Sequence, residues 1–136
     1  MKRAVLALTV LLSVSLSAQV AVKKELEPLQ GGWSLVTAGG QQVPPGLAGI
    51  QFTGDKYEGL TSGKVDERGT IKLDATTKPM MSIDLIIAEG NSAGKTQLGL
   101  VSIDGDTMTL ILADPGATTR PSPETMENKL ILKRIK

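Results

Sequence analysis

The chain has 136 residues, a length that suits one domain, and it contains neither cysteine nor histidine. These absences exclude disulfide cross-links, thiol nucleophiles, histidine bases and the usual ligands of zinc, copper and haem. Lys and Arg residues (15) nearly balance Asp and Glu (14), and only three residues are aromatic, so the charge and stacking surface of a nucleic-acid-binding protein are missing.

The first 18 residues have the composition of a secretory signal peptide. Lys2 and Arg3 form a basic start, and residues 4–16 are apolar, a stretch too short for a membrane span, which needs roughly 20 residues. The small side chains that follow favour cleavage after Ser17, and cleavage after Ala18 is the alternative. We therefore expect export to the periplasm or the extracellular space, with no integral membrane span in the mature protein.

Cleavage at this point leaves a chain whose charges nearly cancel. No cysteine is present at the boundary to carry a lipid, so we expect a soluble protein that is not lipid-anchored. Without Lys2 and Arg3, 13 Lys and Arg residues remain against 14 Asp and Glu, a net charge of −1. Such a balance gives no electrostatic attraction to nucleic acid or to an anionic membrane, and we predict no nucleic-acid partner.

Residues 19–30 form a polar lead-in, and we expect the folded domain over residues 31–136. The segment 22–30 is polar enough for one or two exposed helical turns, which Pro28 should break. After the signal peptide no stretch of ten residues has the helical period, which excludes folds that alternate strands with helices.

From residue 31 onward, apolar and polar residues alternate with the two-residue period of β-strands. Most of these segments are joined by short turns bearing Gly or Asp, such as Gly54-Asp55 and residues 104–106. A meander of this kind closes into a barrel to remove its edges, so we predict an all-β, antiparallel up-and-down barrel of about eight strands. The strands are expected around residues 33–36, 50–52, 56–58, 70–73, 81–87, 98–103, 107–112 and 130–135.

Two segments are expected to be loops. Residues 41–46 contain a Pro-Pro-Gly sequence that cannot pair within a sheet. Residues 114–128 form the one long connection, rich in Pro, Thr and acidic residues. A connection of this length is either functional or mobile, and we favour a mobile segment.

Short motifs in order along the chain point to a family. The most informative is Gly31-Gly32-Trp33, because a Gly-x-Trp sequence opens the first strand of lipocalin-like barrels. This motif extends back to residue 29 (LQGGW), and the remaining motifs are residues 52–57 (FTGDKY), 69–74 (GTIKLD), 78–79 (KP), 83–85 (IDL), 94–96 (GKT), 104–107 (DGDT) and 132–134 (LKR). With these motifs, residues 26–136 resemble a family of small exported domains of unknown function, lipocalin-like and abundant in planctomycete-type bacteria. This resemblance implies a lipocalin-like β-barrel and no assigned reaction.

The resemblance also implies a structural pair at one end of the barrel. Lipocalins place a basic side chain of the last strand over the first-strand tryptophan, and Arg134 occupies that position relative to Trp33. Such a cation–π contact contributes about 0.5–2 kcal/mol. The chain departs from the family at residues 120–126, where an aromatic residue and further glycines are expected, so a role of this loop in the relatives does not carry over.

Three motifs suggest chemistry and are better explained as turns. Residues 90–96 end in Gly-Lys-Thr like a phosphate-binding loop, but Glu89 stands where that loop needs glycine, and a strand follows where a helix is required. The Ser-x-x-Lys spacing at residues 92–95 lacks the two further motifs of penicillin-binding enzymes. Asp104 and Asp106 supply too few oxygens for calcium, so a hairpin turn is favoured there.

We predict that the protein is not an enzyme and uses no cofactor or metal. Without His and Cys, a carboxylate pair is the catalytic arrangement left, for example Asp84 with Glu58 or Asp66. No pattern in the sequence brings two of these side chains together, and Asp84 shares a face with Ser82 that we expect to lie in solvent.

Two functions stay open. In the first, which we favour, the barrel interior binds a small hydrophobic molecule; in the second, the domain has a packed core and is a structural or protein-interaction module of the cell envelope. We expect no inward charge except Arg134, which is used for closure, and this favours an uncharged ligand or none. The candidate lining residues are Leu35, Ile50, Phe52, Ile71, Leu73, Met81, Ile83, Leu85, Leu98, Leu100, Met108 and Leu110, with Leu112, Leu130 and Leu132 on the same faces.

Overall fold

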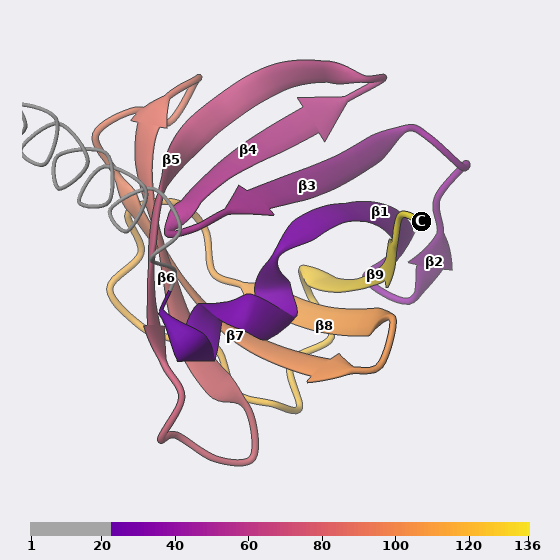
Figure 1. Cartoon of the computed structure of the whole chain (residues 1–136). Helices are drawn as coiled ribbons and strands as arrows, with labels where there is room; N and C mark the ends of the chain where they lie inside the picture. The colour runs from indigo at the N-terminus through magenta and orange to yellow at the C-terminus, as the bar shows by residue number, and fades with distance from the viewer. Residues whose placement is uncertain (1–22) are drawn as a thin grey trace, which may run out of the picture.

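Residues 23–136, which the computed structural model describes, form a closed eight-stranded antiparallel barrel with one additional short strand (Figure 1). The predicted signal peptide, residues 1–18, and residues 19–22 of the lead-in lie outside the described residues. The prediction of an all-β up-and-down barrel is confirmed. The strands are β1 (Gly31–Ala38), β2 (Gln41–Gln42), β3 (Ala48–Thr53), β4 (Lys56–Thr61), β5 (Lys64–Asp74), β6 (Met81–Glu89), β7 (Thr96–Asp104), β8 (Thr107–Leu112) and β9 (Lys129–Arg134).

Each barrel strand pairs antiparallel with the next, and β9 returns to pair with β1, which closes the sheet. In this closing pair Trp33 lies opposite Arg134. Strand β2 pairs with β1 alone, across a turn at Gly39 and Gly40 whose φ angles are +58° and +84°. Glycine suits both positions because such hairpin turns need positive φ at their two central residues. The expected loop over residues 41–46 is therefore wrong for its first two residues.

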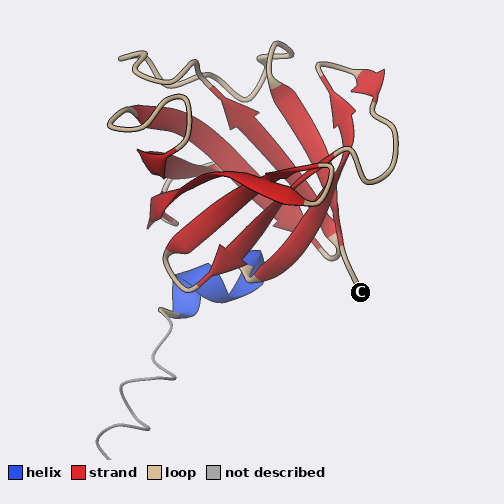
Figure 2. Cartoon of the chain, turned by 90° about the horizontal axis from the view of Figure 1, so that it is seen from above, coloured by secondary structure: helices blue, strands red, loops and turns tan. Residues whose placement is uncertain are grey.

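A 3₁₀-helix, η1 (Lys24–Leu29), lies across one end of the barrel (Figure 2). Leu26 and Leu29 are buried in the barrel core, and the other residues of η1 are exposed. The predicted helical turns are therefore present. The prediction that Pro28 breaks these turns is wrong: Pro28 lies inside the helix, which ends at Leu29, because the fixed φ of proline is compatible with a helical turn.

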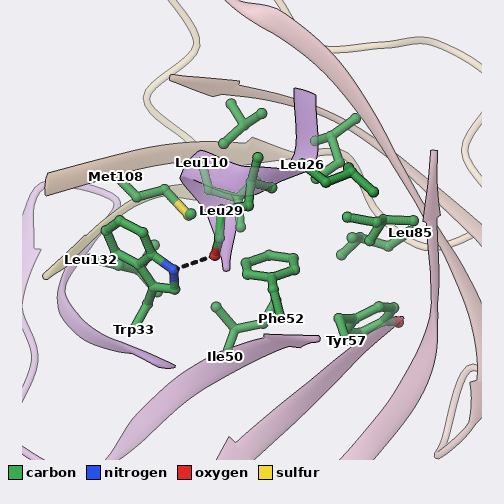
Figure 3. Close-up of a cluster of buried hydrophobic side chains, with 13 residues drawn as sticks. Leu26, Leu29, Trp33, Ile50, Phe52, Tyr57, Leu85, Met108, Leu110 and Leu132 are labelled. Atoms are coloured by element: carbon green, nitrogen blue, oxygen red, sulfur yellow. Dashed lines mark hydrogen bonds between the residues drawn. The ribbon is translucent and has the colours of Figure 1, made fainter. Parts of the chain in front are cut away.

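The half of the barrel next to η1 is filled by side chains that point inward from the strands (Figure 3). Trp33 is the largest of these side chains, and its Nε1 donates a hydrogen bond of 2.8 Å to the carbonyl oxygen of Leu29. The helix is thus part of the core and not an appended segment. The buried cluster comprises Leu26, Leu29, Trp33, Ile50, Phe52, Tyr57, Ile71, Ile83, Leu85, Val101, Met108, Leu110 and Leu132.

Strand β7 faces the opposite way from the prediction. Ile83 points into the core and lies opposite Gly99, so Gly99 and Val101 point inward while Leu98 and Leu100 point outward. The prediction that Leu98 and Leu100 line the interior is therefore wrong. This stretch carries apolar side chains on both faces, and a shift of one residue in such a strand exchanges the two faces.

The connection between β8 and β9 lies against this outer wall. Arg120 Nη1 donates hydrogen bonds of 3.1 and 2.9 Å to backbone carbonyls of β6 and β7, and its Nη2 lies 2.8 Å from Asp84 Oδ1. Leu100 and Ile111 point outward opposite each other, yet are only 7% and 0% exposed. Asp84 is thus held in an ion pair and does not stand free in solvent. The connection is anchored at Arg120, and the mobility of its remaining residues stays a prediction.

Candidate functional site

The barrel is hollow toward the end opposite η1. A cavity of about 150 Å³ lies there, and all eight barrel strands contribute to its wall. Most of the wall is made of aliphatic side chains. The lining residues are Leu35, Ala48, Gly49, Ile50, Tyr57, Gly59, Glu67, Leu85, Gln97, Leu110, Leu112, Leu130 and Leu132.

Small residues on β3 and β4 leave this space open. Ala48 and Gly59 lie near the open-end termini of these strands, where larger residues would reach into the barrel. Farther down, Trp33 and Phe52 fill the interior and are 0% and 1% exposed. The cavity therefore has a packed floor, and it opens toward the rim.

Three polar side chains lie among the apolar ones. The Tyr57 hydroxyl donates a hydrogen bond of 2.8 Å to Glu67 Oε2, and Gln97 Nε2 donates one of 2.9 Å to the backbone carbonyl of Ala113. Both Glu67 and Gln97 are partly exposed. The Glu67 carboxylate and the Gln97 amide oxygen keep lone pairs that accept no hydrogen bond from residues 23–136. The site is thus an apolar cavity with hydrogen-bond acceptors in its wall.

Glu67 corrects the expectation that no charge except Arg134 points inward. Strand β5 begins at Lys64 and not near residue 70, and Glu67 lies on it opposite Gly59. Counting back from Ile71 in steps of two places Glu67 on the inward face, so the alternation held this signal. The charged residues at 64–68 are typical of a solvent-exposed segment, so Glu67 was not expected inside the barrel.

The structure divides the candidate lining residues into three groups. The residues that line the cavity are Leu35, Ile50, Leu85 and Leu110, together with Leu112, Leu130 and Leu132. The residues of the packed core or its edge that do not reach the cavity are Phe52, Ile71, Leu73, Met81, Ile83 and Met108. The residues on the outer face are Leu98 and Leu100.

Arg134 ties the closed end together. Its guanidinium carbon lies 4.3 Å from the centre of the Trp33 ring. Its Nη1 and Nη2 donate hydrogen bonds of 2.9 and 3.1 Å to the carbonyl oxygens of Gln30 and Pro28, and its Nε lies 3.3 Å from Asp106 Oδ1. These contacts join the last strand to η1 and to the first strand, so this pair is part of the barrel closure and lies away from the cavity.

The free energy of unfolding should depend on pH through Tyr57. Burial raises the pKa of Tyr57 far above its usual range, and the hydrogen bond and negative charge of Glu67 raise it further. The folded protein then keeps this proton above about pH 10 while the unfolded chain loses it, so the free energy of unfolding falls as the pH rises. The contribution of Tyr57 is at most about 1.4 kcal/mol per pH unit.

Absorbance of tyrosinate in the near ultraviolet tests this prediction, because Tyr57 is the only tyrosine of the chain. We expect no tyrosinate in the folded protein until it unfolds, and a titration near pH 10 in denaturant. Tyr57→Phe should remove the corresponding loss of stability in urea unfolding above about pH 10. A folded protein that titrates at about pH 10 would contradict the buried, hydrogen-bonded tyrosine.

A larger depression, of about 490 Å³, lies on the outer face of β3 to β6. Its wall includes Glu58, Arg68 and Glu89. Arg68 Nε lies 2.9 Å from Glu58 Oε2, and Arg68 Nη1 lies 3.6 Å from Glu89 Oε1, so these three charged groups are already paired with one another. The wall of the interior cavity is the more apolar of the two, so this cavity is the better candidate site for a hydrophobic molecule.

No family model matches the chain, and no curated protein is significantly similar to it. Among residues 23–136, no three Asp, Glu, His or Cys side chains come together as metal ligands would. In the same part of the chain, no helix has the length and apolar character needed to cross a membrane. The fold and site define a small antiparallel barrel with an apolar internal cavity.

Proposed function

We propose that this protein is an exported, lipocalin-like binding protein that holds a small hydrophobic molecule in the cavity at the open end of its barrel and catalyses no reaction. The observation that carries this proposal is an apolar cavity to which every strand of a closed barrel contributes. An eight-stranded barrel is of the size at which the interior either fills with side chains or holds one small ligand. Here the half next to η1 is filled and the other half is hollow.

The cavity volume sets the size of the ligand. The cavity measures about 150 Å³. An aliphatic cavity of roughly 150 Å³ holds a molecule of the size of benzene, whereas drug-sized ligands occupy roughly 300–1,000 Å³. We therefore propose a ligand close to a single six-membered ring in size, and we exclude full enclosure of a long-chain fatty acid.

Three exposed apolar side chains lie at the open end of the barrel, and a fourth, Ile135, lies at the closed end. Leu47, Val65 and Met126 lie in or beside the segments that connect the strands at the open end, and they are 44%, 37% and 55% exposed. They favour entry of a hydrophobic molecule from this side.

The second candidate is a structural or protein-interaction module of the cell envelope. The packed core next to η1 favours it, because most of the barrel is held together without a ligand. In that case the apolar mouth contacts a protein, and the cavity binds no small molecule. The same experiments separate the two candidates.

Toluene is the first probe. At about −0.7 kcal/mol per non-hydrogen atom, we expect it to bind with a Kd of about 0.3 mM, measured by calorimetry or ligand-observed NMR. Ala48→Leu places a larger side chain at the cavity wall and should weaken binding by about tenfold or more. Lys72→Leu adds the same side chain at an exposed position outside the cavity and should leave the Kd unchanged.

Native mass spectrometry on protein purified gently from its source then tests whether a ligand is carried. A non-covalent adduct that is lost on denaturation supports the binding function and supplies the ligand for identification. A bare mass together with no toluene binding would reject it and favour the envelope module.

A further inference from the structure

We propose that the cavity selects a small apolar amine, whose ammonium group binds the carboxylate of Glu67. The inference rests on the proposed function, because it names the class of molecule that the cavity holds. It differs from the uncharged ligand that the sequence suggested, since that expectation assumed no inward carboxylate.

The polar groups of the cavity wall favour a ligand that donates hydrogen bonds. The Tyr57 hydroxyl hydrogen is used in its bond to Glu67, and Gln97 uses one of its amide hydrogens on the Ala113 carbonyl. A carboxylate offers about four lone-pair positions, and Tyr57 occupies one of those on Glu67. An ammonium group carries three N–H donors and no acceptor, which complements a wall that presents mainly acceptors.

The charge of the cavity wall favours a cation. Glu67 is the single charged residue of the lining, and no Lys or Arg is part of it. None of the ion pairs among residues 23–136 includes Glu67. A partly buried carboxylate without a cationic partner gains from one that a ligand brings, and the same charge repels an anionic ligand.

The apolar part of the ligand can contact the leucine side chains across the cavity from Glu67. Glu67 lies on β5, whereas Leu35, Leu112 and Leu130 lie on β1, β8 and β9, which occupy the far side of the closed strand order. A molecule with an ammonium group at one end and a hydrocarbon ring or chain at the other can satisfy both walls. The carboxylate therefore orients the ligand, and the leucine wall provides most of the buried apolar area.

Three probes of similar size separate charge from shape: benzylamine, benzyl alcohol and benzoate. At neutral pH we expect calorimetry on the wild-type protein to give a benzylamine Kd at least about tenfold lower than that of benzyl alcohol. Benzoate should show no measurable binding. This comparison uses the unaltered protein, so it holds even if a variant fails to fold.

Two matched variants test whether Glu67 is the residue that gives the preference for benzylamine. Glu67→Gln keeps an oxygen for the Tyr57 hydroxyl but removes the charge, and it should raise the Kd of benzylamine to that of benzyl alcohol. Glu58→Gln removes the same charge from the outer depression, outside the cavity lining, and should preserve the preference for benzylamine.

The outcomes distinguish this inference from the function on which it rests. If toluene and benzyl alcohol bind but benzylamine has no advantage, the amine inference is overturned and the binding function stands. A preference that persists in Glu67→Gln also overturns it, because another group would then recognise the amine. If none of the probes binds the wild-type protein, the proposed function fails and the inference falls with it.

Discussion

Replacing Trp33 by alanine is expected to lower the free energy of unfolding by about 3–5 kcal/mol, the usual cost of deleting a large buried aromatic side chain. Trp33 is 0% exposed and is the largest buried side chain of the described residues. It packs beneath η1, donates a hydrogen bond to Leu29, and carries the guanidinium of Arg134 over its ring. Removing it leaves a cavity and an unpaired carbonyl together, at the point where the first strand, the last strand and η1 meet.

Urea unfolding followed by far-ultraviolet circular dichroism measures this loss, because the signal does not depend on the deleted indole. Two variants divide the effect. Trp33→Phe retains a ring and should cost about 1–3 kcal/mol, mainly because the Leu29 carbonyl loses its donor. Arg134→Gln removes the cation over the ring and should cost about 0.5–2 kcal/mol from that contact. A loss below about 1 kcal/mol for Trp33→Ala would mean that the closed end is not packed as described.

The barrel was predictable because its strands have one clear period and short turns. The alternation at residues 81–85 and 107–110 is regular, and both segments lie in strands with the expected inward faces. The closing contact was predictable for another reason: the resemblance named Arg134 as the partner of Trp33, and the register places the two residues opposite each other.

It was harder to predict which residues of each strand point into the barrel, and the reason is physical. Alternation sets the inward face only where the outer face is polar. On β7 the outer residues Leu98 and Leu100 lie on the wall to which Arg120 holds the long connection, so both faces are apolar. Nothing in the sequence near β7 reveals that a segment far along the chain lies against it. The inward role of Gly99 and Val101 therefore needed the fold.

The cavity could not be predicted from the identity of its lining residues. The same leucines would line a hollow barrel or fill a packed one, and the difference depends on small residues such as Ala48 and Gly59 in the same part of the wall. Which residues come together there is set by register, including the irregularity of the β4–β5 pairing next to Gly59. The alternation in the sequence puts Glu67 on the inward face, and its register opposite Gly59 puts it in the cavity wall.

Replacing Gly69 by alanine is the second change expected to have a large effect, about 3 kcal/mol of lost stability. Gly69 lies on β5 opposite Tyr57, and a methyl group built there would overlap the carbonyl oxygen of Ile86 and lie 2.8 Å from Tyr57 Cε1. Backbone cannot move aside as the end of a flexible side chain can, so β5 and β6 would have to separate locally. Urea unfolding measures the loss.

Gly59→Ala is the matched control, on the neighbouring strand. A methyl group there would lie 3.5 Å from its nearest neighbours, an ordinary contact distance, so we expect a change within about 0.5 kcal/mol. The two glycines then separate a requirement for close backbone approach from a general preference for glycine in these strands. Equal losses in both variants would refute the close approach at Gly69. Because the Tyr57 ring lies against Gly69 while its hydroxyl binds Glu67, Gly69→Ala should also displace the carboxylate and reduce the preference for benzylamine in any protein that still folds.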